Sequence, residues 1–160
     1  MLSSSDSTAR SSALDAPGEP APKLNCYPPV RFASETLFDS VPGAVAFHCS
    51  TVCEAANGDL VCVWYGGSYE SAEDQSLYIA RRAKGGREWS TPEVLIRNPD
   101  QPPGNAIVFR GTGNTLRLVW GRMEGSRPTR RGSGWKKCSL MMRTSEDNGR
   151  TWSTDTQIPD

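Results

Sequence analysis

The eight residues from Ser145 to Trp152 read SEDNGRTW, and they decide the fold. Asp147-Asn148-Gly149 is typical of a tight turn, because Asp and Asn side chains bond to nearby backbone groups and Gly accepts positive φ. Short runs with strand character, 137–145 and 151–158, flank this turn. The stretch therefore predicts a β-hairpin whose tryptophan packs in a core.

A second copy of this hairpin stands earlier in the chain. Trp89 and Trp152 lie 63 residues apart, and the same offset aligns Gly86 with Gly149 and Leu77 with Leu140. The earlier copy reads RAKGGREW over 82–89, and it lacks the Ser, Asp and Thr of the later one. The chain therefore contains an internal repeat with one complete and one degenerate turn.

Each repeat contains four short predicted strands and almost no helical periodicity. The expected strands cover 45–55, 59–67, 75–83 and 88–96 in the first repeat, and 106–111, 115–122, 137–145 and 151–158 in the second. Residues 31–39 also have strand character. Repeated four-stranded antiparallel units indicate an all-β fold of the β-propeller class. We expect a disordered Ser/Pro-rich tail over 1–28 and a partial propeller over 29–160, with blade one about 45–96 and blade two about 105–158.

Composition excludes several classes of partner. The 18 Lys and Arg balance the 18 Asp and Glu, so no overall charge attracts nucleic acid. The sequence holds neither a long apolar run nor a secretory signal pattern, which argues against a membrane partner. The odd number of cysteines favours buried free thiols and a reducing, cytoplasmic compartment. The five cysteines are Cys26, Cys49, Cys53, Cys62 and Cys138. We expect neither a metal nor a cofactor.

SEDNGRTW fits the pattern Ser-x-Asp-x-Gly-x-Thr-Trp throughout, and it resembles the Asp box, or BNR repeat, of sialidases (neuraminidases) and related six-bladed propellers. The resemblance implies that the box closes the hairpin between a blade's third and fourth strands, with a ligand or calcium site at Asp147 as the alternative. Two further stretches, FHCSTVCEAANGDLVCVWYGGSYESAEDQSLYIARR (47–82) and GNAIVF (104–109), resemble the first blade and the entry to the second. The implied structural residues are Ser145, Asp147, Gly149, Thr151 and Trp152.

Strand direction brings the polar candidates to one end of the sheets. In a four-stranded meander, the start of the first strand and the loop between the second and third strands lie at the same end. Carboxylates there can transfer protons, and guanidinium groups can bind an anionic sugar. Each kind of candidate also has a non-functional explanation: the histidine can be a packing residue, the acidic residues can be acids of a solvent-exposed loop, and the basic residues can belong to a solvated loop. The candidates are His48, Glu70, Glu73, Asp74, Asn105, Arg122, Arg127, Arg130 and Arg131.

We expect Asp74, or else Glu70, to act as the general acid/base, with His48, Asn105 and the arginines binding the carbohydrate. By resemblance, Asp74 best matches the catalytic aspartate of sialidases. His48 stands where those enzymes carry an arginine that grips the substrate carboxylate, and Ser50 replaces their proline. A neutral histidine makes no bidentate contact with a carboxylate, so the substrate clamp differs from theirs.

Two blades do not close a propeller, because each blade needs a neighbour on both faces. The sequence therefore predicts the N-terminal part of a sialidase-like, exo-acting glycoside hydrolase that acts on an anionic sugar and has no turnover alone. The tyrosine nucleophile of sialidases would lie in later blades. A non-catalytic glycan- or protein-binding propeller and a non-functional truncated product are the alternatives. Self-association is a further way to cover the open blade faces.

Overall fold

The computed structural model describes residues 32–123 and 137–159, so the predicted tail lies outside the described residues. The chain divides into two units, Met1–Glu35 and Thr36–Asp160. The described part of the first unit, 32–35, contains no strand. Every strand described below belongs to the second unit.

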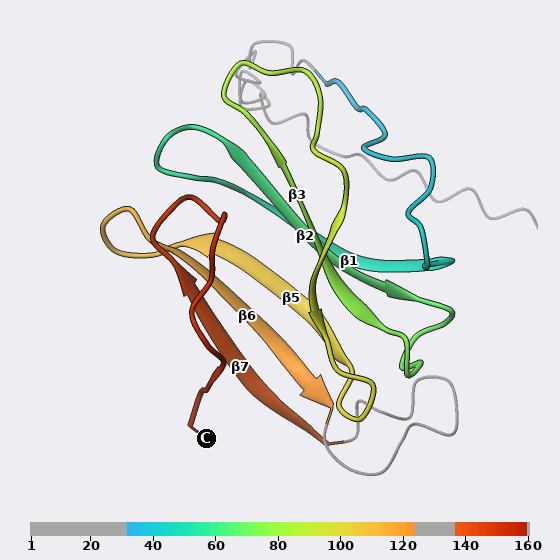
Figure 1. Cartoon of the computed structure of the whole chain (residues 1–160). Helices are drawn as coiled ribbons and strands as arrows, with labels where there is room; N and C mark the ends of the chain where they lie inside the picture. The colour runs from blue at the N-terminus through green and yellow to red at the C-terminus, as the bar shows by residue number, and fades with distance from the viewer. Residues whose placement is uncertain (1–31, 124–136, 160) are drawn as a thin grey trace, which may run out of the picture. The chain divides into compact units, whose positions relative to one another are not determined.

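Within the described residues, eight strands form two four-stranded antiparallel sheets, in the orders β1-β2-β3-β4 and β5-β6-β7-β8 (Figure 1). The residues that the structure describes form no helix, so the all-β prediction is confirmed. The strands are β1 (Ala46–Glu54), β2 (Leu60–Gly67), β3 (Ser76–Arg82), β4 (Glu93–Arg97), β5 (Pro103–Arg110), β6 (Leu116–Met123), β7 (Cys138–Ser145) and β8 (Thr156–Gln157).

Residues 32–39 do not form the strand that their sequence predicts. Leu37 and Phe38 instead pack by their side chains on a cluster in the first sheet, and the Phe38 ring lies 5.7 Å from the Trp64 ring. The backbone then turns at Val41, which pairs with Ala44. The prediction was wrong because these apolar side chains pack on a sheet face without a neighbouring strand to pair with.

The fourth strands begin later than predicted, because a serine follows each tryptophan. Ser90 donates its N–H to the Arg81 carbonyl at 2.7 Å, and its hydroxyl oxygen accepts the Arg81 N–H at 3.0 Å. Ser153 makes the same two bonds with Thr144, at 2.8 and 3.0 Å. The matching pairs place Arg81 and Thr144 at the same position of the two repeats.

A β-bulge interrupts the first strand of each sheet. The register shifts between His48 and Thr51 in β1 and between Gly104 and Ile107 in β5. The residue inside each bulge has positive φ, 48° at Cys49 and 50° at Asn105. Asn adopts this conformation readily, whereas it costs Cys backbone strain. Cys49 and Asn105 therefore hold equivalent positions in the two sheets.

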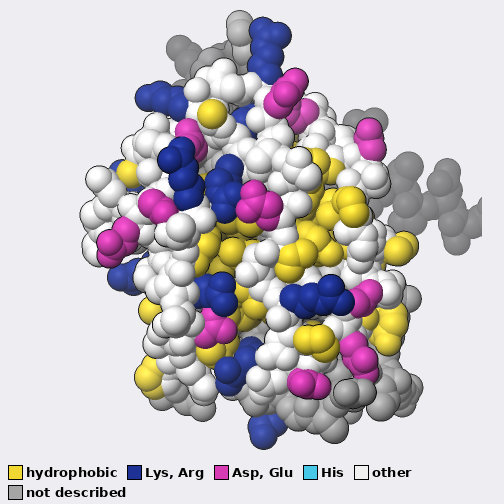
Figure 2. All heavy atoms as spheres, in the orientation of Figure 1, with side chains coloured by type: hydrophobic (Ala, Val, Ile, Leu, Met, Phe, Trp, Pro, Cys, Tyr) yellow, Lys and Arg dark blue, Asp and Glu magenta, His cyan; other side chains and the backbone are white. Residues whose placement is uncertain are grey.

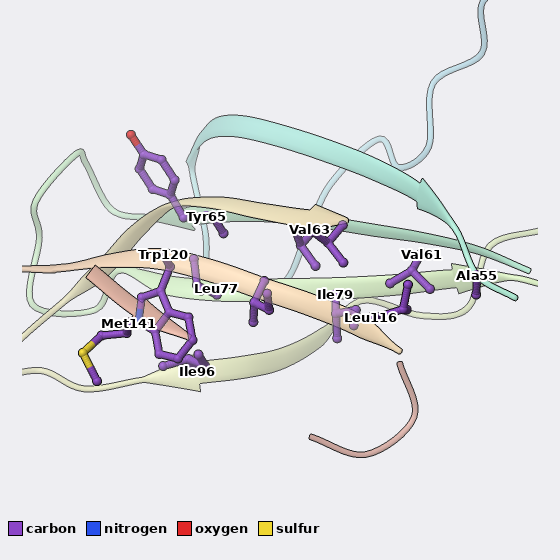
Figure 3. Close-up of a cluster of buried hydrophobic side chains, with 13 residues drawn as sticks. Ala55, Val61, Val63, Tyr65, Leu77, Ile79, Ile96, Leu116, Trp120 and Met141 are labelled. Carbon is purple, nitrogen blue, oxygen red and sulfur yellow. The ribbon is translucent and has the colours of Figure 1, made fainter. Parts of the chain in front are cut away.

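The two sheets pack face to face around one apolar core (Figure 3). β5 lies against β1 and β2, and Trp152 packs on the edge of the core. Burying each large apolar side chain stabilises the fold by about 1.5–3 kcal/mol. Apolar side chains also remain at the surface among charged ones on the side drawn in Figure 2. The core residues are Ala55, Val61, Val63, Tyr65, Leu77, Ile79, Ile96, Ala106, Val108, Leu116, Leu118, Trp120 and Met141.

Hydrogen bonds between side chains and backbone also cross from one sheet to the other. The Val108 N–H donates to the Thr51 hydroxyl oxygen at 3.1 Å. The Arg81 Nε–H donates to the Gly149 carbonyl at 2.8 Å, and the Asn57 N–H donates to Asn148 Oδ1 at 3.4 Å. The SEDNGRTW turn of the second sheet is therefore tied to the first sheet by polar groups as well as by the core.

The Asp147 carboxylate organises that turn. It accepts the N–H groups of Arg150 and Thr151 and the hydroxyls of Ser145 and Thr151, at 2.6–3.1 Å. The bonds from Thr151 hold the pKa of Asp147 well below its ordinary value. Gly149 has a φ of 83°, and a Cβ there would lie 3.3 Å from the Val61 side chain. The oxygens of Asp147 are therefore used inside the hairpin.

The first sheet closes its degenerate turn differently. Lys84 stands where the second repeat has Asp147, and its N–H donates to Oδ1 of Asp59 at 2.9 Å. Asp59 belongs to the turn between β1 and β2, and this bond from Lys84 lowers its pKa. Positive φ falls on Gly85 (72°) and not on Gly86. A carboxylate from a neighbouring turn thus supplies the acceptor that the first repeat lacks.

The four described cysteines are free thiols, but only Cys62 is buried. Cys49 and Cys138 are exposed, so the expectation of burial was wrong for both: Cys49 lies in the β-bulge of β1, and Cys138 is the first residue of β7. Burial raises the pKa of the Cys62 thiol. Cys26 lies outside the described residues.

We expect Asp147→Asn to lower the melting temperature by about 5–10 °C at pH 7, because the charged acceptor of four donors is lost. The native carboxyl has a lowered pKa, so the unfolded state binds its proton first as the pH falls. The stability from Asp147 is therefore complete above about pH 5 and declines below about pH 4. Differential scanning calorimetry at pH 3 and pH 7 should show a smaller pH dependence for Asp147→Asn than for the wild type. An equal pH dependence would contradict this account.

Candidate functional site

The polar candidates meet at one end of the sheets, called here the site end: His48 in β1, the loop 68–75 between β2 and β3, and Asn105 in β5. His48 pairs with Tyr65 across β1 and β2, two residues before β2 ends at Gly67. The loop that follows carries Glu70 and Asp74. His48 and Asp74 thus lie at the same end of the first sheet, opposite the SEDNGRTW-type turns.

His48, Tyr65 and Glu70 form a connected group. The His48 ring stacks on the Tyr65 ring at 5.1 Å between centroids, and their planes differ by 19°. The Tyr65 hydroxyl donates to Oε1 of Glu70 at 3.4 Å. Figure 3 shows Tyr65 at the edge of the core, with its hydroxyl directed away from the other labelled side chains. Nε2 of His48 is buried and has no hydrogen-bond partner within the described residues.

Tyr65 is suited to orient Glu70. Only 2% of the surface of Tyr65 is exposed to solvent. Burial raises the pKa of the Tyr65 hydroxyl above its ordinary value, and the Glu70 charge and Cys49 raise it further. The phenol therefore keeps its proton at neutral pH and can act as a donor to the Glu70 carboxylate.

Asp74 closes the loop on itself. Its carboxylate accepts the Ser68 N–H at 3.1 and 3.2 Å and the Ser68 hydroxyl at 2.5 Å. Partial burial raises the pKa of Asp74, but the bonds from Ser68 outweigh this effect, so its pKa lies below the ordinary value. At neutral pH the group is a carboxylate that accepts hydrogen bonds rather than a proton donor.

Gln75 joins this loop to the second sheet. It is fully buried, and its Oε1 accepts the Ser71 N–H at 2.7 Å. Its Nε2 donates to the Pro103 carbonyl at 2.7 Å, two residues before Asn105. Ser71 itself is buried and has a φ of 68°. One amide thus fixes the loop that carries Glu70 beside the bulge that carries Asn105.

Of the other predicted binding residues, the structure describes Asn105 and Arg122. Asn105 is exposed in its bulge. Arg122 lies near the end of β6, and its Nη2 donates to Oε1 of Gln157 at 3.3 Å. Arg127, Arg130 and Arg131 lie outside the described residues. The structure thus brings together His48, Glu70 and Asp74 in the first sheet, with Asn105 on the adjoining strand of the second.

Three residues of this arrangement were missed in the sequence: Tyr65, Ser68 and Gln75. The pairing of Tyr65 with His48 depends on the register of β1 and β2, and a bulge next to His48 shifts that register. Ser68 lies in a polar loop, where a serine gives no signal of a specific partner. No local signal marks Gln75 as a buried link, since its partner Pro103 lies 28 positions along the chain.

Two further searches of the described residues bear on the kind of site. No three His, Cys, Asp or Glu side chains gather in them in a way that could hold a metal ion. None of their segments forms a helix with the length and apolarity needed to cross a membrane.

Comparisons with known proteins agree with the fold. The family model described as a BNR repeat-like domain matches residues 58–160. Among solved structures, the Hadza microbial sialidase Hz136 is similar, with a TM-score of 0.60, 16% sequence identity and 72% of this chain covered. A sequence search of curated proteins finds no match.

The similarity to the sialidase concerns architecture. At 16% identity it shows the fold, and the two sheets are accordingly blades of a sialidase-type β-propeller. The chain spans 26% of the length of that sialidase chain.

Replacing Gln75 tests whether one amide couples the loop to the second sheet. We expect Gln75→Leu to lower the free energy of unfolding by about 2–4 kcal/mol, because the Ser71 N–H and the Pro103 carbonyl lose their buried partner. Urea unfolding followed by circular dichroism measures the loss, and amide exchange at Ser71 should accelerate. Gln157→Leu, at an exposed position, is the matched control. A loss for Gln75→Leu within that of the control would disprove the coupling.

Proposed function

Because this chain belongs to the BNR repeat-like family, whose fold here is that of a sialidase-type propeller, we propose that its site end forms part of the sugar site of an exo-acting glycoside hydrolase. The observation that carries the proposal is the stacked and hydrogen-bonded group of His48, Tyr65 and Glu70. Gln75 holds this group next to Asn105. The expected ligand is an anionic, polyhydroxylated sugar.

Glu70 is the better supported of the two acid/base candidates. Its side chain is partly buried and accepts the Tyr65 hydroxyl, which fixes its direction. In the proposed reaction, Glu70 exchanges a proton with the glycosidic oxygen or with water. Asp74 would have to release Ser68 and gain a proton against its lowered pKa to do the same. We therefore assign Asp74 the task of holding the loop.

Recognition of the sugar is assigned to nitrogen donors around Glu70. Nε2 of His48 and the side-chain amide of Asn105 can bond to hydroxyl oxygens or to a carboxylate. The arginines would supply positive charge for an anionic group of the sugar, because a guanidinium group binds a carboxylate with two parallel hydrogen bonds. These arginines are Arg122, Arg127, Arg130 and Arg131. Since the chain spans 26% of the matched sialidase, we expect catalytic groups from further blades and no turnover by these 160 residues alone.

A non-catalytic glycan-binding propeller is the second candidate. The lowered pKa of Asp74 favours it, and so does the resemblance to sialidases, by which His48 stands where those enzymes carry an arginine. Binding needs fixed donors and acceptors but no group whose pKa is matched to proton transfer.

Saturation-transfer NMR of the 160-residue chain with sialic acid, a uronic acid and neutral monosaccharides tests the site. We expect signal from an acidic sugar, and at least a tenfold weaker affinity (about 1.4 kcal/mol) in His48→Ala and in Asn105→Ala. Glu146→Gln, an exposed change at the opposite end of the sheets, should leave binding unchanged. Binding that survives both substitutions at the site end, or no binding to any sugar, would contradict the proposed site.

The same variants separate enzyme from binder. Wherever hydrolysis of an aryl glycoside is measurable, Glu70→Gln should lower the rate by about 100-fold or more while leaving affinity within about threefold. A rate unchanged by Glu70→Gln would remove Glu70 from the chemistry. Robust hydrolysis by the isolated 160 residues would overturn the expectation that further blades are needed.

A further inference from the structure

The loop between β2 and β3 contains a strained and incompletely bonded residue next to Glu70. Ser71 has a φ of 68°, in the left-handed region that a serine rarely adopts. Its side chain is fully buried, and its Oγ has no hydrogen-bond partner within the described residues. A left-handed backbone and a buried hydroxyl without a partner both raise the free energy of a conformation. The loop therefore holds a conformation that Ser71 by itself disfavours.

The hydrogen bonds between Ser68 and Asp74, called here the latch, oppose this strain. The Asp74 carboxylate accepts the N–H and the hydroxyl of Ser68 at 2.5–3.2 Å, and these bonds close the loop across six positions. A Cβ on Gly67 would lie 3.0 Å from Oδ1 of Asp74, so a larger residue there would push against the latch. Ser68 is exposed and Asp74 is partly exposed. Bonds that solvent can reach thus hold a buried, strained segment in place.

The strain at Ser71 is coupled to the position of Glu70. The two residues share a peptide unit, and Oε1 of Glu70 accepts the Tyr65 hydroxyl at 3.4 Å. Gln75, at the other end of the segment, is bonded to the Pro103 carbonyl of the second sheet, so that end stays in place. A change of φ at Ser71 would therefore move the part of the loop that carries Glu70 and break its bond to Tyr65.

Acid removes the charge on which the latch depends. Partial burial raises the pKa of Asp74, but the bonds from Ser68 and the charge of Arg97, at the end of β4, outweigh this effect, so the pKa lies below its ordinary value. Tyr78, in β3, also interacts with Asp74. The latched form binds the proton more weakly than a released form would, so the latch is complete above the ordinary pKa of an aspartate and is lost as the pH falls below about 4.

We propose that residues 68–74 form a two-state element that regulates the sugar site. With Asp74 charged, the latch holds Ser71 in its strained conformation and keeps Glu70 on Tyr65. With Asp74 protonated, the latch opens, Ser71 relaxes and Glu70 leaves Tyr65, which weakens the binding of the sugar. This inference rests on the proposed function and describes the regulation of that same site.

A pH titration of the 160-residue chain, followed by amide NMR, tests the coupling. In the wild type, the N–H signals of Ser68 and Ser71 should move with one shared midpoint below about pH 4. In Asp74→Asn, both signals should differ from the wild type already at pH 7 and should move little in acid. Glu70 and Glu73 are carboxyl groups of the same loop, so this variant identifies the group responsible. A Ser71 signal that titrates equally in the variant, or that stays fixed while Ser68 moves, would overturn the proposal.

Relief of the strain gives a second measurement, made at pH 7. Ser71→Gly removes the buried hydroxyl and allows a φ of 68° without strain, so adding it to Asp74→Asn should slow amide exchange over 69–73 by about tenfold. Ser71→Ala removes the hydroxyl but keeps the backbone strain, and it should restore less. Exchange that is no slower with Ser71→Gly than without it would contradict the stored strain. Glu146→Gln, at the opposite end of the sheets, is the control and should leave exchange in this loop unchanged.

Sugar binding separates a failure of this inference from a failure of the proposed function. In saturation-transfer NMR at pH 7 with sialic acid and a uronic acid, Asp74→Asn should bind about tenfold more weakly than the wild type, and Ser71→Gly should restore part of the loss. If Asp74→Asn binds as tightly as the wild type while His48→Ala does not, the sugar site stands and its regulation by the latch is refuted. If neither sugar binds the wild type, the proposed function fails, and the loop regulates no sugar site whether or not it moves.

Discussion

The packing of one face of the first sheet on one face of the second is the interaction on which this structure depends. Val61, Val63 and Leu77 meet Leu118 and Trp120 in a single core. Neither sheet could bury this surface alone, because a four-stranded sheet without a partner exposes both faces to water. The polar links between the sheets, such as Arg81 to Gly149, are added to an interface that apolar burial already defines. The position of the candidate site follows from it, since the site is shared by the two sheets.

The candidate site is held by buried polar groups rather than by its exposed ones. Gln75 satisfies a loop N–H and a strand carbonyl in different sheets, so loop and strand keep one relative position. Ser68 and Asp74 close the same loop from its two ends. Tyr65 then fixes the position of the Glu70 carboxylate, because the Tyr65 ring is packed in the core and its hydroxyl donates a hydrogen bond to that carboxylate. Pre-organisation of this kind lets a loop residue act with a fixed geometry.

Local signals in the sequence predicted most of the fold. SEDNGRTW and its degenerate copy RAKGGREW each depend on neighbouring residues, and together with the short strand-like runs they predicted the hairpins and the all-β class. The failures depend on distant contacts. Residues 32–39 have strand composition but no strand to pair with, and the two bulges shift which residues of β1 and β5 face the core. The end of the sheets that holds the candidate site followed from strand direction alone, whereas the bonding of Asp74 and Gln75 required the folded chain.

The bulges at Cys49 and Asn105 determine which side of the sheet each later side chain of β1 and β5 faces. One extra residue reverses which side of the sheet every later side chain meets, so His48 and Thr51, three positions apart, lie on the same side of the first sheet, as do Gly104 and Ile107 in the second. Deleting a single residue between the bulge and the following turn would exchange the inner and outer sides of that strand. Gains and losses of length in the connections after β2 and β6 leave the alternation intact. We therefore expect such repeats to diverge in the length of those connections more than in the length of their strands.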